Sequence, residues 1–316
     1  MKFIFTGILL LAAYVGSAQN TVLQFTDYSV ARPLINPAYM GVETGVNGMA
    51  LYRSRFEKSD YWPSTGAFNI NSSIKDKNLG GGLTIMYNKY GPYQKLFAYV
   101  AGSYKLKINE GKNLYFGIQA GVNYVSNSGD YRKADEEEVI FSDNYSQPNF
   151  GFGLHYQADK FFLGFSIPEF KYNTIDNEGN KINQMVSEFL KIYLYGGYKF
   201  NMTPNLTLTP YTYLSYSEQD AMQMDIGGRL CYKEAFEFGA QFRTKEAFAV
   251  TARVKLFEEL WLGYSFEGNN SDINNTFNST QEITVTFRFG KKGSSDSKGS
   301  QQGNDSYDNI NSIRYF

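Results

Sequence analysis

Apolar and polar residues alternate along most of the chain, as they do in β-strands with two different faces. Within residues 113–124, for example, Phe116 and Ile118 alternate with Gly117 and Gln119. No helical period of comparable length occurs. The alternating runs between turn signals predict fourteen strands, at residues 46–56, 64–74, 79–88, 94–108, 112–129, 148–157, 161–167, 190–200, 206–216, 223–232, 236–243, 247–256, 260–267 and 280–289.

The connections between these strands fall into two classes. Those after even-numbered strands are tight, at residues 75–78, 109–111, 158–160, 201–205, 233–235 and 257–259. Those after odd-numbered strands are more variable and polar, at residues 57–63, 89–93, 130–147, 168–189, 217–222, 244–246 and 268–279. Barrels of the outer membrane combine an even strand number with short turns at one end and longer loops at the other. The pattern therefore predicts an all-β fold, a transmembrane antiparallel up-and-down β-barrel of about 14 strands within residues 46–290.

The placement of charged and aromatic residues favours the barrel over a soluble β-sandwich. Basic residues such as Arg53, Arg229 and Arg253 lie opposite the apolar stripes. There they would face a wet lumen, whereas a basic residue at the lipid midplane costs about 2–4 kcal/mol. The 26 Tyr and 26 Phe residues suit the lipid face and the aromatic girdles of a barrel. A sandwich core would also use aromatic residues, but it gives no reason for the asymmetric connections.

Both ends of the chain differ from the barrel. Residues 1–18 have a Lys, an apolar stretch and a small-residue cleavage site, which predicts a signal peptide. Residues 19–45 lack periodicity and are expected to plug the lumen or cap its periplasmic mouth. Residues 291–316 are rich in Gly, Ser, Asn and Asp, which predicts a flexible tail. In an outer-membrane barrel with an even strand number, both termini are expected to be periplasmic.

Composition and motifs exclude most catalytic chemistry. The chain has 30 basic and 31 acidic residues, so it lacks the excess of positive charge that is typical of nucleic-acid-binding proteins. Cys231 is the single cysteine, so no intramolecular disulfide forms. His155 is the single histidine and is expected to point inward, with no positioned nucleophile beside it. We therefore predict no catalytic residue, cofactor or metal site.

Two further motifs have ordinary structural explanations. Residues 80–82 are three glycines, but no Gly-Lys-Ser/Thr follows them as in a phosphate-binding loop. They are expected to give room for close packing. The acidic run 135–138 could attract calcium, but an isolated acidic run is usually solvated.

Several short segments resemble the opening of the PorP/SprF family, outer-membrane proteins of the type IX secretion system in Bacteroidetes. The most specific is Asn36, Pro37, Ala38 and Tyr39 followed by Gly41, and the others are Gln24-Phe25 with Tyr28, Tyr52-Arg53 after Ala50-Leu51, residues 80–83 and residues 90–92. The chain departs from the family pattern at residues 54–56, where Asn-Gln-Trp is expected, and its tail after Gly290 is additional.

The resemblance implies a non-enzymatic component of the secretion or gliding machinery in the outer membrane. Its implied partners are an exported surface protein with a type IX C-terminal signal domain, periplasmic or outer-membrane machinery, and outer-membrane lipid. The family positions carried over are Asn36, Pro37, Ala38, Tyr39, Gly41, Tyr52 and Arg53, and no catalytic residues come with them.

The long predicted loops, chiefly 130–147 and 168–189, are the expected docking site for the exported protein. Aromatic residues dominate interface energetics. The candidate partner-binding residues are therefore Trp62, Tyr90, Tyr93, Tyr131, Phe141 and Tyr145. The alternative function is a passive channel or small-solute transporter with a basic lumen.

Overall fold

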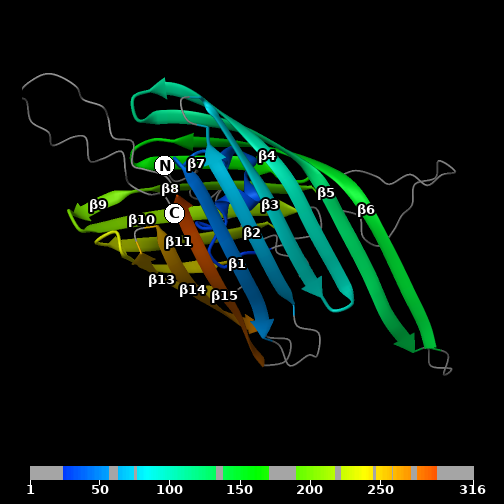
Figure 1. Cartoon of the computed structure of the whole chain (residues 1–316). Coiled ribbons are helices and arrows are strands. Elements are labelled where there is room, and N and C mark those ends of the chain that lie inside the picture. The colour runs from blue at the N-terminus through cyan, green and yellow to red at the C-terminus, as the bar shows by residue number, and fades with distance from the viewer. Residues whose placement is uncertain are drawn as a thin grey trace, which may run out of the picture.

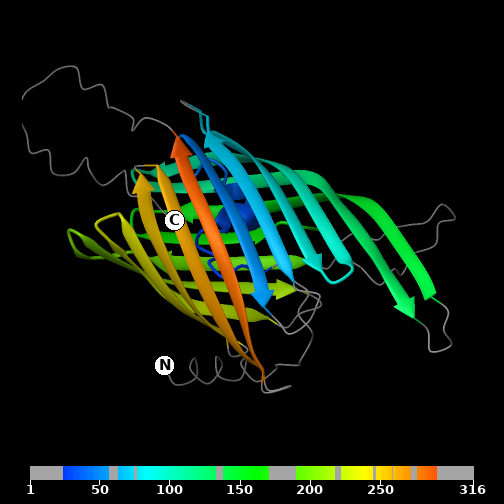
Figure 2. The same ribbon diagram turned by 60° about the horizontal axis from the view of Figure 1, so that its bottom comes forward.

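The computed structural model describes residues 24–56, 63–74, 77–132, 138–170, 190–217, 222–244, 247–257, 259–271 and 276–289. Their strands form one antiparallel sheet that closes where β1 (Val46–Phe56) pairs with β15 (Thr276–Phe289) (Figures 1 and 2). Fourteen strands make the closed barrel and one short strand is additional, so the predicted fold is confirmed. The other strands are β2 (Ser64–Ser73), β3 (Leu79–Tyr90), β4 (Tyr93–Asn109), β5 (Lys112–Arg132), β6 (Glu138–Gln157), β7 (Phe161–Ile167), β8 (Lys191–Tyr198), β9 (Phe200–Thr203), β10 (Leu206–Ser217), β11 (Gln223–Tyr232), β12 (Phe236–Arg243), β13 (Ala247–Phe257) and β14 (Leu260–Ser271).

The two faces of the wall follow the alternation in the sequence. Ile118 and Val100 point outward and are 71% and 66% exposed, whereas their inward neighbours Gln119 and Tyr99 are buried. The expectation that charges face the lumen also holds for the buried Arg53, Arg229, Arg243 and Arg253. No helix in the described part of the chain is long and apolar enough to cross a bilayer.

Some aromatic residues lie where the sequence did not place them. Tyr198 and Phe200 form an outward pair at a strand end, 4.6 Å between ring centroids, as an aromatic girdle requires. A second group instead faces inward and is buried: Phe97, Tyr99, Tyr193, Tyr195, Tyr211 and Tyr213. These inner rings pack against apolar residues of the N-terminal segment, which turns part of the lumen into a hydrophobic core.

The connections at the two ends of the barrel differ, but three of the expected loops are largely strand. The end with tight connections, called the turn side here, includes the two-residue turn between β4 and β5. At the opposite end, the loop side, the predicted loops 89–93, 130–147 and 268–279 are replaced by extensions of the flanking strands. Alternation identifies a strand only where one face is apolar, so polar strand extensions escape it.

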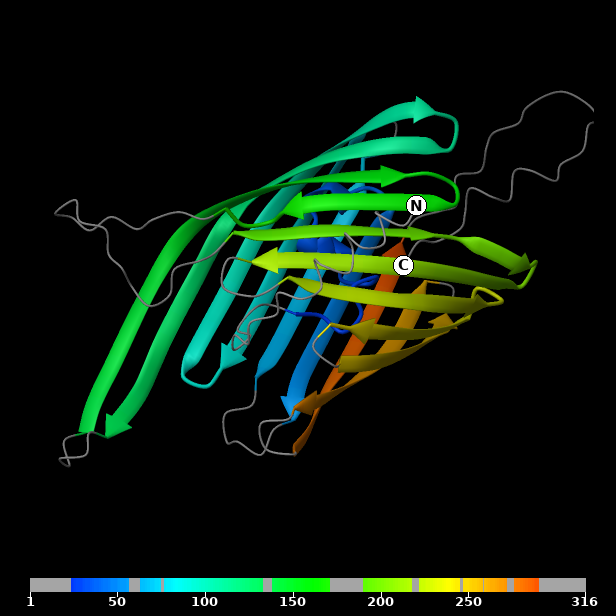
Figure 3. The same ribbon diagram turned by 180° about the vertical axis from the view of Figure 1, so that it is seen from behind.

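The longest extension is the hairpin of β5 and β6. Its strands have 21 and 20 residues and stay paired from Asn113–Gln157 to Arg132–Glu138. Figure 3 shows this hairpin projecting beyond the neighbouring strands on the loop side. Another difference is the predicted strand 190–200, which is interrupted at Lys199 and forms β8 and β9.

The N-terminal segment 24–45, called the plug here, lies inside the barrel (Figure 1). It contains α2 (Arg32–Ile35) and the 3-10 helix η1 (Pro37–Tyr39). Each short helix has a proline in its first turn, where the missing N–H is not needed. The predicted signal peptide and the predicted tail lie outside the described residues.

The lipid-facing band predicts a depth-dependent cost for a charge. Ile118→Lys, near the middle of the outward apolar stretch 114–124 of β5, is expected to lower the free energy of unfolding by about 2–4 kcal/mol, and Leu106→Lys, near the turn-side end of β4, by about 0–1 kcal/mol. Both side chains point outward. Denaturant titration of the barrel in lipid vesicles measures both values. Equal costs at the two positions would contradict the placement of the band.

Candidate functional site

The plug runs along the lumen from the loop side to the turn side. Its first described residue, Gln24, donates a side-chain hydrogen bond to Gln223 at the loop-side start of β11, 2.9 Å apart. Its last residue, Gly45, leads into β1 at the turn side. The last described residue, Phe289, also lies on the turn side because it pairs with Val46. The periplasmic position of both termini stays a prediction.

A buried ion pair joins the plug to β11. Nη2 of Arg229 lies 2.7 and 2.8 Å from the two carboxylate oxygens of Asp27 and also donates to Ser29. Burial alone would raise the pKa of Asp27, but Arg229, Arg253 and the hydrogen bonds from Ser29 outweigh burial and hold this pKa below its usual value. Asp27 therefore stays ionised and keeps the plug attached to the wall.

A carboxylate of β15 holds the plug backbone. The two oxygens of Glu282 accept hydrogen bonds from the backbone N–H groups of Thr26 and Asp27, at 2.8 and 3.1 Å. Glu282 is fully buried, and Arg53 of β1 lies 3.9 Å from it. A buried carboxylate needs such partners because desolvation costs several kcal/mol. The wall thus recognises the path of the plug backbone and not only its side chains.

Arg243 of β12 connects the plug to a wall network. It donates to the carbonyl oxygen of Phe25 at 2.6 Å and pairs with Asp225 at 2.9 Å and with Glu267 at 2.6 Å. Gln241, on the same face of β12, donates to the carbonyl oxygen of Thr26 at 2.7 Å. The backbone of residues 25–27 is therefore bound to the barrel both through N–H groups and through carbonyl oxygens.

Asn36 fixes the second half of the plug. Its side-chain nitrogen donates to the carbonyl oxygen of Leu154 and to the hydroxyl of Tyr195, each at 3.0 Å. Its side-chain oxygen accepts from the N–H of Ala38 at 2.9 Å and thereby caps η1. A Cβ at Gly153 would overlap this oxygen. Asn36 therefore acts both as a helix cap and as a contact with β6.

The wall beneath η1 is shaped by glycine. A Cβ at Gly117 of β5 would overlap backbone atoms of Pro37 and Ala38, and one at Gly80 of β3 would overlap Met40. Gly41 has a φ of +83°, a conformation that favours glycine, and it lies against Gly80. The expectation that residues 80–82 give room for close packing is thus confirmed at Gly80.

The remaining family positions have different surroundings. Tyr39 is buried, with its ring centroid 5.2 Å from that of His155. Arg53 points inward, 3.7 Å from Glu267, whereas Tyr52 points outward and is 57% exposed. The structure therefore brings six of the seven family positions, all except Tyr52, to the contact between plug and wall.

His155 faces inward, as expected from the alternation. Its Nδ1 lies 3.1 Å from the Tyr195 hydroxyl, and its Nε2 lies 3.2 Å from the side-chain oxygen of Gln157. The side chain is fully buried beneath Tyr39. These contacts make His155 part of the surface on which the plug rests.

The segment after β7 turns into the lumen on the loop side. Gln119 donates to the carbonyl oxygen of Pro168 at 2.8 Å, and Lys95 lies 3.5 Å from Glu169. Glu169 is buried. The predicted docking loop 168–189 thus begins inside the barrel, and its residues 171–189 lie outside the described residues.

The six candidate partner-binding residues do not form one described cluster. Tyr90 and Tyr93 pair across the two-residue turn between β3 and β4, and Tyr90 is 49% exposed. Tyr131 and Phe141 lie in the projecting parts of β5 and β6, and Tyr145 is half-buried on β6. Trp62 lies outside the described residues.

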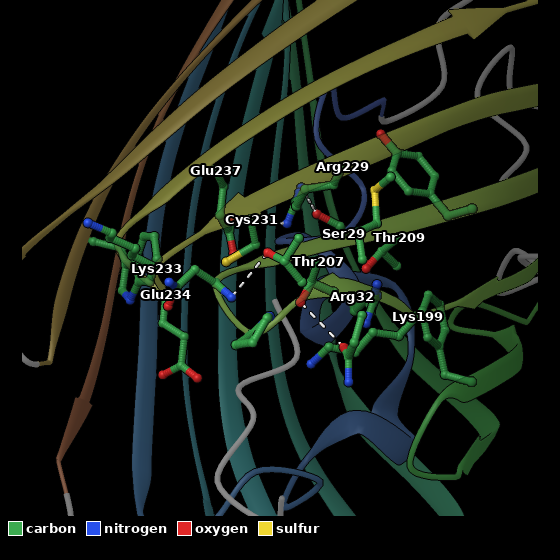
Figure 4. A pocket seen from close by; sticks show the side chains of 18 residues that line it. Ser29, Arg32, Lys199, Thr207, Thr209, Arg229, Cys231, Lys233, Glu234 and Glu237 are labelled. Atoms are coloured by element: carbon green, nitrogen blue, oxygen red, sulfur yellow. Dashed lines mark hydrogen bonds and ion pairs between the residues drawn. The ribbon is translucent and has the colours of Figure 1, made fainter.

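A cavity of about 750 Å³ lies between the plug and the wall at the turn side (Figure 4). The plug contributes Ser29 and Arg32, and the wall contributes basic, hydroxyl and apolar side chains, Cys231 and the two acidic residues Glu234 and Glu237. The residues of the β9–β10 and β11–β12 turns form its mouth. Within the described residues, no group of three or more His, Cys, Asp or Glu could hold a metal ion. The acidic run 135–138 falls mostly outside those residues.

Sequence reasoning missed the plug contacts of Glu282 and the wall positions Gly117 and Gly153. A signal was present, because each glycine stands on an inward-facing position of a long strand. Glycine there weakens a strand unless another backbone approaches closely. The pairing of Asp27 with Arg229, 202 residues away, leaves no such local signal.

Solved structures with a similar fold are outer-membrane barrels. The Ralstonia pickettii toluene transporter TbuX matches with 10% identity and a TM-score of 0.52, over 86% of this chain and 97% of that chain. The P. putida toluene transporter TodX matches with 8% identity and a TM-score of 0.50, over 81% and 93%. The CymD monoaromatic hydrocarbon channel matches with 10% identity and a TM-score of 0.52, over 87% and 95%. At these identities the likeness shows the fold alone.

The sequence comparisons identify the family. No curated protein matches the sequence. A family model described as type IX secretion system membrane protein PorP/SprF matches residues 17–287, which include the plug and nearly all of the barrel. The chain therefore belongs to the PorP/SprF family of type IX secretion system membrane proteins.

Proposed function

We propose that this barrel is a non-enzymatic platform that assists export or surface anchoring of a partner protein, which it holds through its loop side. The partner is an exported surface protein with a type IX C-terminal signal domain. The observation that carries the proposal is the combination of a filled lumen with a strand hairpin that projects from one end of the barrel. Such a molecule presents a docking surface and not a pore.

The filled lumen supports the platform function over a passive channel or small-solute transporter. The plug contacts β15, β12 and β11 through its first half, and β6 through Asn36. Its other half lies against glycines of β3 and β5. Buried ion pairs at these contacts are costly to break, at about 3–5 kcal/mol when one partner is removed. The plug is therefore a fixed part of the barrel.

The projecting hairpin supports docking on the loop side. β6 pairs with β5 over its full length, but with β7 only over Phe152–Gln157. The projecting part of β6 thus lies beyond the end of the neighbouring strand. Partner proteins commonly add a strand to an exposed sheet edge of this kind. In the proposed orientation the turn side faces the periplasm and the hairpin faces outward.

The closed lumen predicts a lack of conductance. The full protein in planar bilayers is expected to give no steady single-channel current, because the plug fills the lumen. Deleting residues 24–41 is expected to open the lumen and to produce steady current. Heat-modified migration on gels confirms that the shortened chain still forms a barrel. Steady current through the full protein, equal to that of the deletion variant, would favour the channel.

The docking proposal predicts loss of the partner when the hairpin is shortened. Replacing residues 129–141 by Asn-Gly keeps Ser128 opposite Ser142 and removes the projecting tip. Tagged protein purified from native outer membrane in mild detergent is expected to retain the signal-domain partner about tenfold less than the wild type, as the loss of ~1.4 kcal/mol of binding free energy would produce.

A matched control alters a turn at the other end of the barrel. Lys233 and Glu234 both have a φ of +51°, so Lys233→Asn with Glu234→Gly suits the backbone of this tight turn. This control is expected to retain the partner at the wild-type level. If the shortened hairpin also retained the partner at that level, the loop-side assignment would be wrong.

A further inference from the structure

Arg32 of the plug is a buried cation whose charge no described carboxylate balances. Its side chain is 2% exposed, and its Nε donates to the hydroxyl of Tyr213 at 2.8 Å. The guanidinium carbon lies 4.1 Å from the ring centroid of Phe162. Among the described residues no Asp or Glu forms an ion pair with it, and its buried Nη1 has no hydrogen-bond partner. The Arg32 side chain as a whole lines the turn-side cavity.

The other buried arginine of the cavity is balanced by the protein itself. Arg229 lies 2.7 Å from Asp27 and 3.4 Å from Glu237. Among the described residues, Arg32 contacts a hydroxyl and aromatic rings, which weakly offset the cost of burying a charge. Within that part of the chain, the same cavity thus contains one arginine with two carboxylates and one with none. This contrast indicates that the anion that balances the charge of Arg32 is not one of the described residues but a bound ligand.

The cavity has the size and the lining of a small-molecule site. Its volume of about 750 Å³ falls within the range of ~300–1,000 Å³ of ligand pockets. Lys199 adds a second cation, and Thr207 adds a hydroxyl on the same wall (Figure 4). Phe162 and Met202 supply apolar surface. Glu237, which also lines the cavity, already pairs with Arg229. A ligand that fits beside Arg32 and Lys199 therefore has a negative charge and an apolar body.

We propose that the turn-side cavity binds an organic carboxylate, whose oxygens accept hydrogen bonds from the guanidinium of Arg32 and from Lys199. A carboxylate carries the single charge that would balance Arg32, and its apolar part would cover Phe162 and Met202. Inorganic phosphate would carry up to two charges and has no apolar part. The mouth formed by the β9–β10 and β11–β12 turns gives the ligand its entry from the turn side.

The test is a ¹⁹F NMR titration of the full protein in detergent with 4-(trifluoromethyl)benzoate. The neutral isostere 4-(trifluoromethyl)benzamide and inorganic phosphate are measured in parallel, and empty micelles give the background. Saturable binding of the benzoate is expected, about tenfold tighter than that of the benzamide, because a hydrogen bond to a charged group is lost in the amide. Phosphate is expected to displace the benzoate only weakly.

Two variants and one control locate the site. Arg32→Gln is expected to weaken benzoate binding about tenfold, and Lys199→Gln, which leaves the plug intact, to weaken it several-fold. Lys107→Gln makes the same charge change at an exposed residue of β4 that does not line the cavity. It is expected to leave the affinity unchanged. Heat-modified migration checks that each variant forms a barrel.

Three results would overturn the proposal. The first is benzamide binding as tightly as benzoate, because the carboxylate would then contribute nothing. The second is an equal loss of affinity in Lys199→Gln and Lys107→Gln, which would indicate general attraction of anions. The third is phosphate binding as tightly as benzoate, which would exclude an organic carboxylate as the preferred ligand.

Discussion

The contact between Glu282 and the plug backbone is the interaction on which the inner structure depends. Glu282 is fully buried, and its carboxylate is satisfied by the N–H groups of Thr26 and Asp27. Asp27 in turn pairs with Arg229, which is also buried. A buried charge without a partner costs several kcal/mol. The charged lumen wall and the plug therefore stabilise each other.

The shape of the wall adds a second constraint to these charges. Gly117 and Gly153 let the backbone around Asn36 approach the strands more closely than any side chain would allow. Polar contacts position the first half of the plug, and close packing positions the second half. A plug held in both ways occupies much of the lumen, so the surfaces left for binding lie towards the two ends of the barrel. The projecting hairpin occupies one end and the cavity of Arg32 the other.

Much of the barrel could be predicted from the sequence because alternation is a local signal. Ile118 outward and Gln119 inward followed directly from it. The hairpin beyond residue 129 was missed because the charged run around residues 132–138 interrupts the alternation and was interpreted as a polar loop. The site could be predicted only in part. Asn36 was found through a family motif, but its contact with Gly153 joins residues 117 positions apart, and such pairs leave no trace in one sequence.

The most direct test of a plug fixed to the wall is hydrogen–deuterium exchange of residues 25–40 in the folded protein. The N–H groups of Thr26, Asp27 and Ala38 are hydrogen-bonded and buried. They are expected to exchange as slowly as the amides of β5 and far more slowly than those of the tight turn at Gly111. Exchange of the plug as fast as that of this turn would contradict the account.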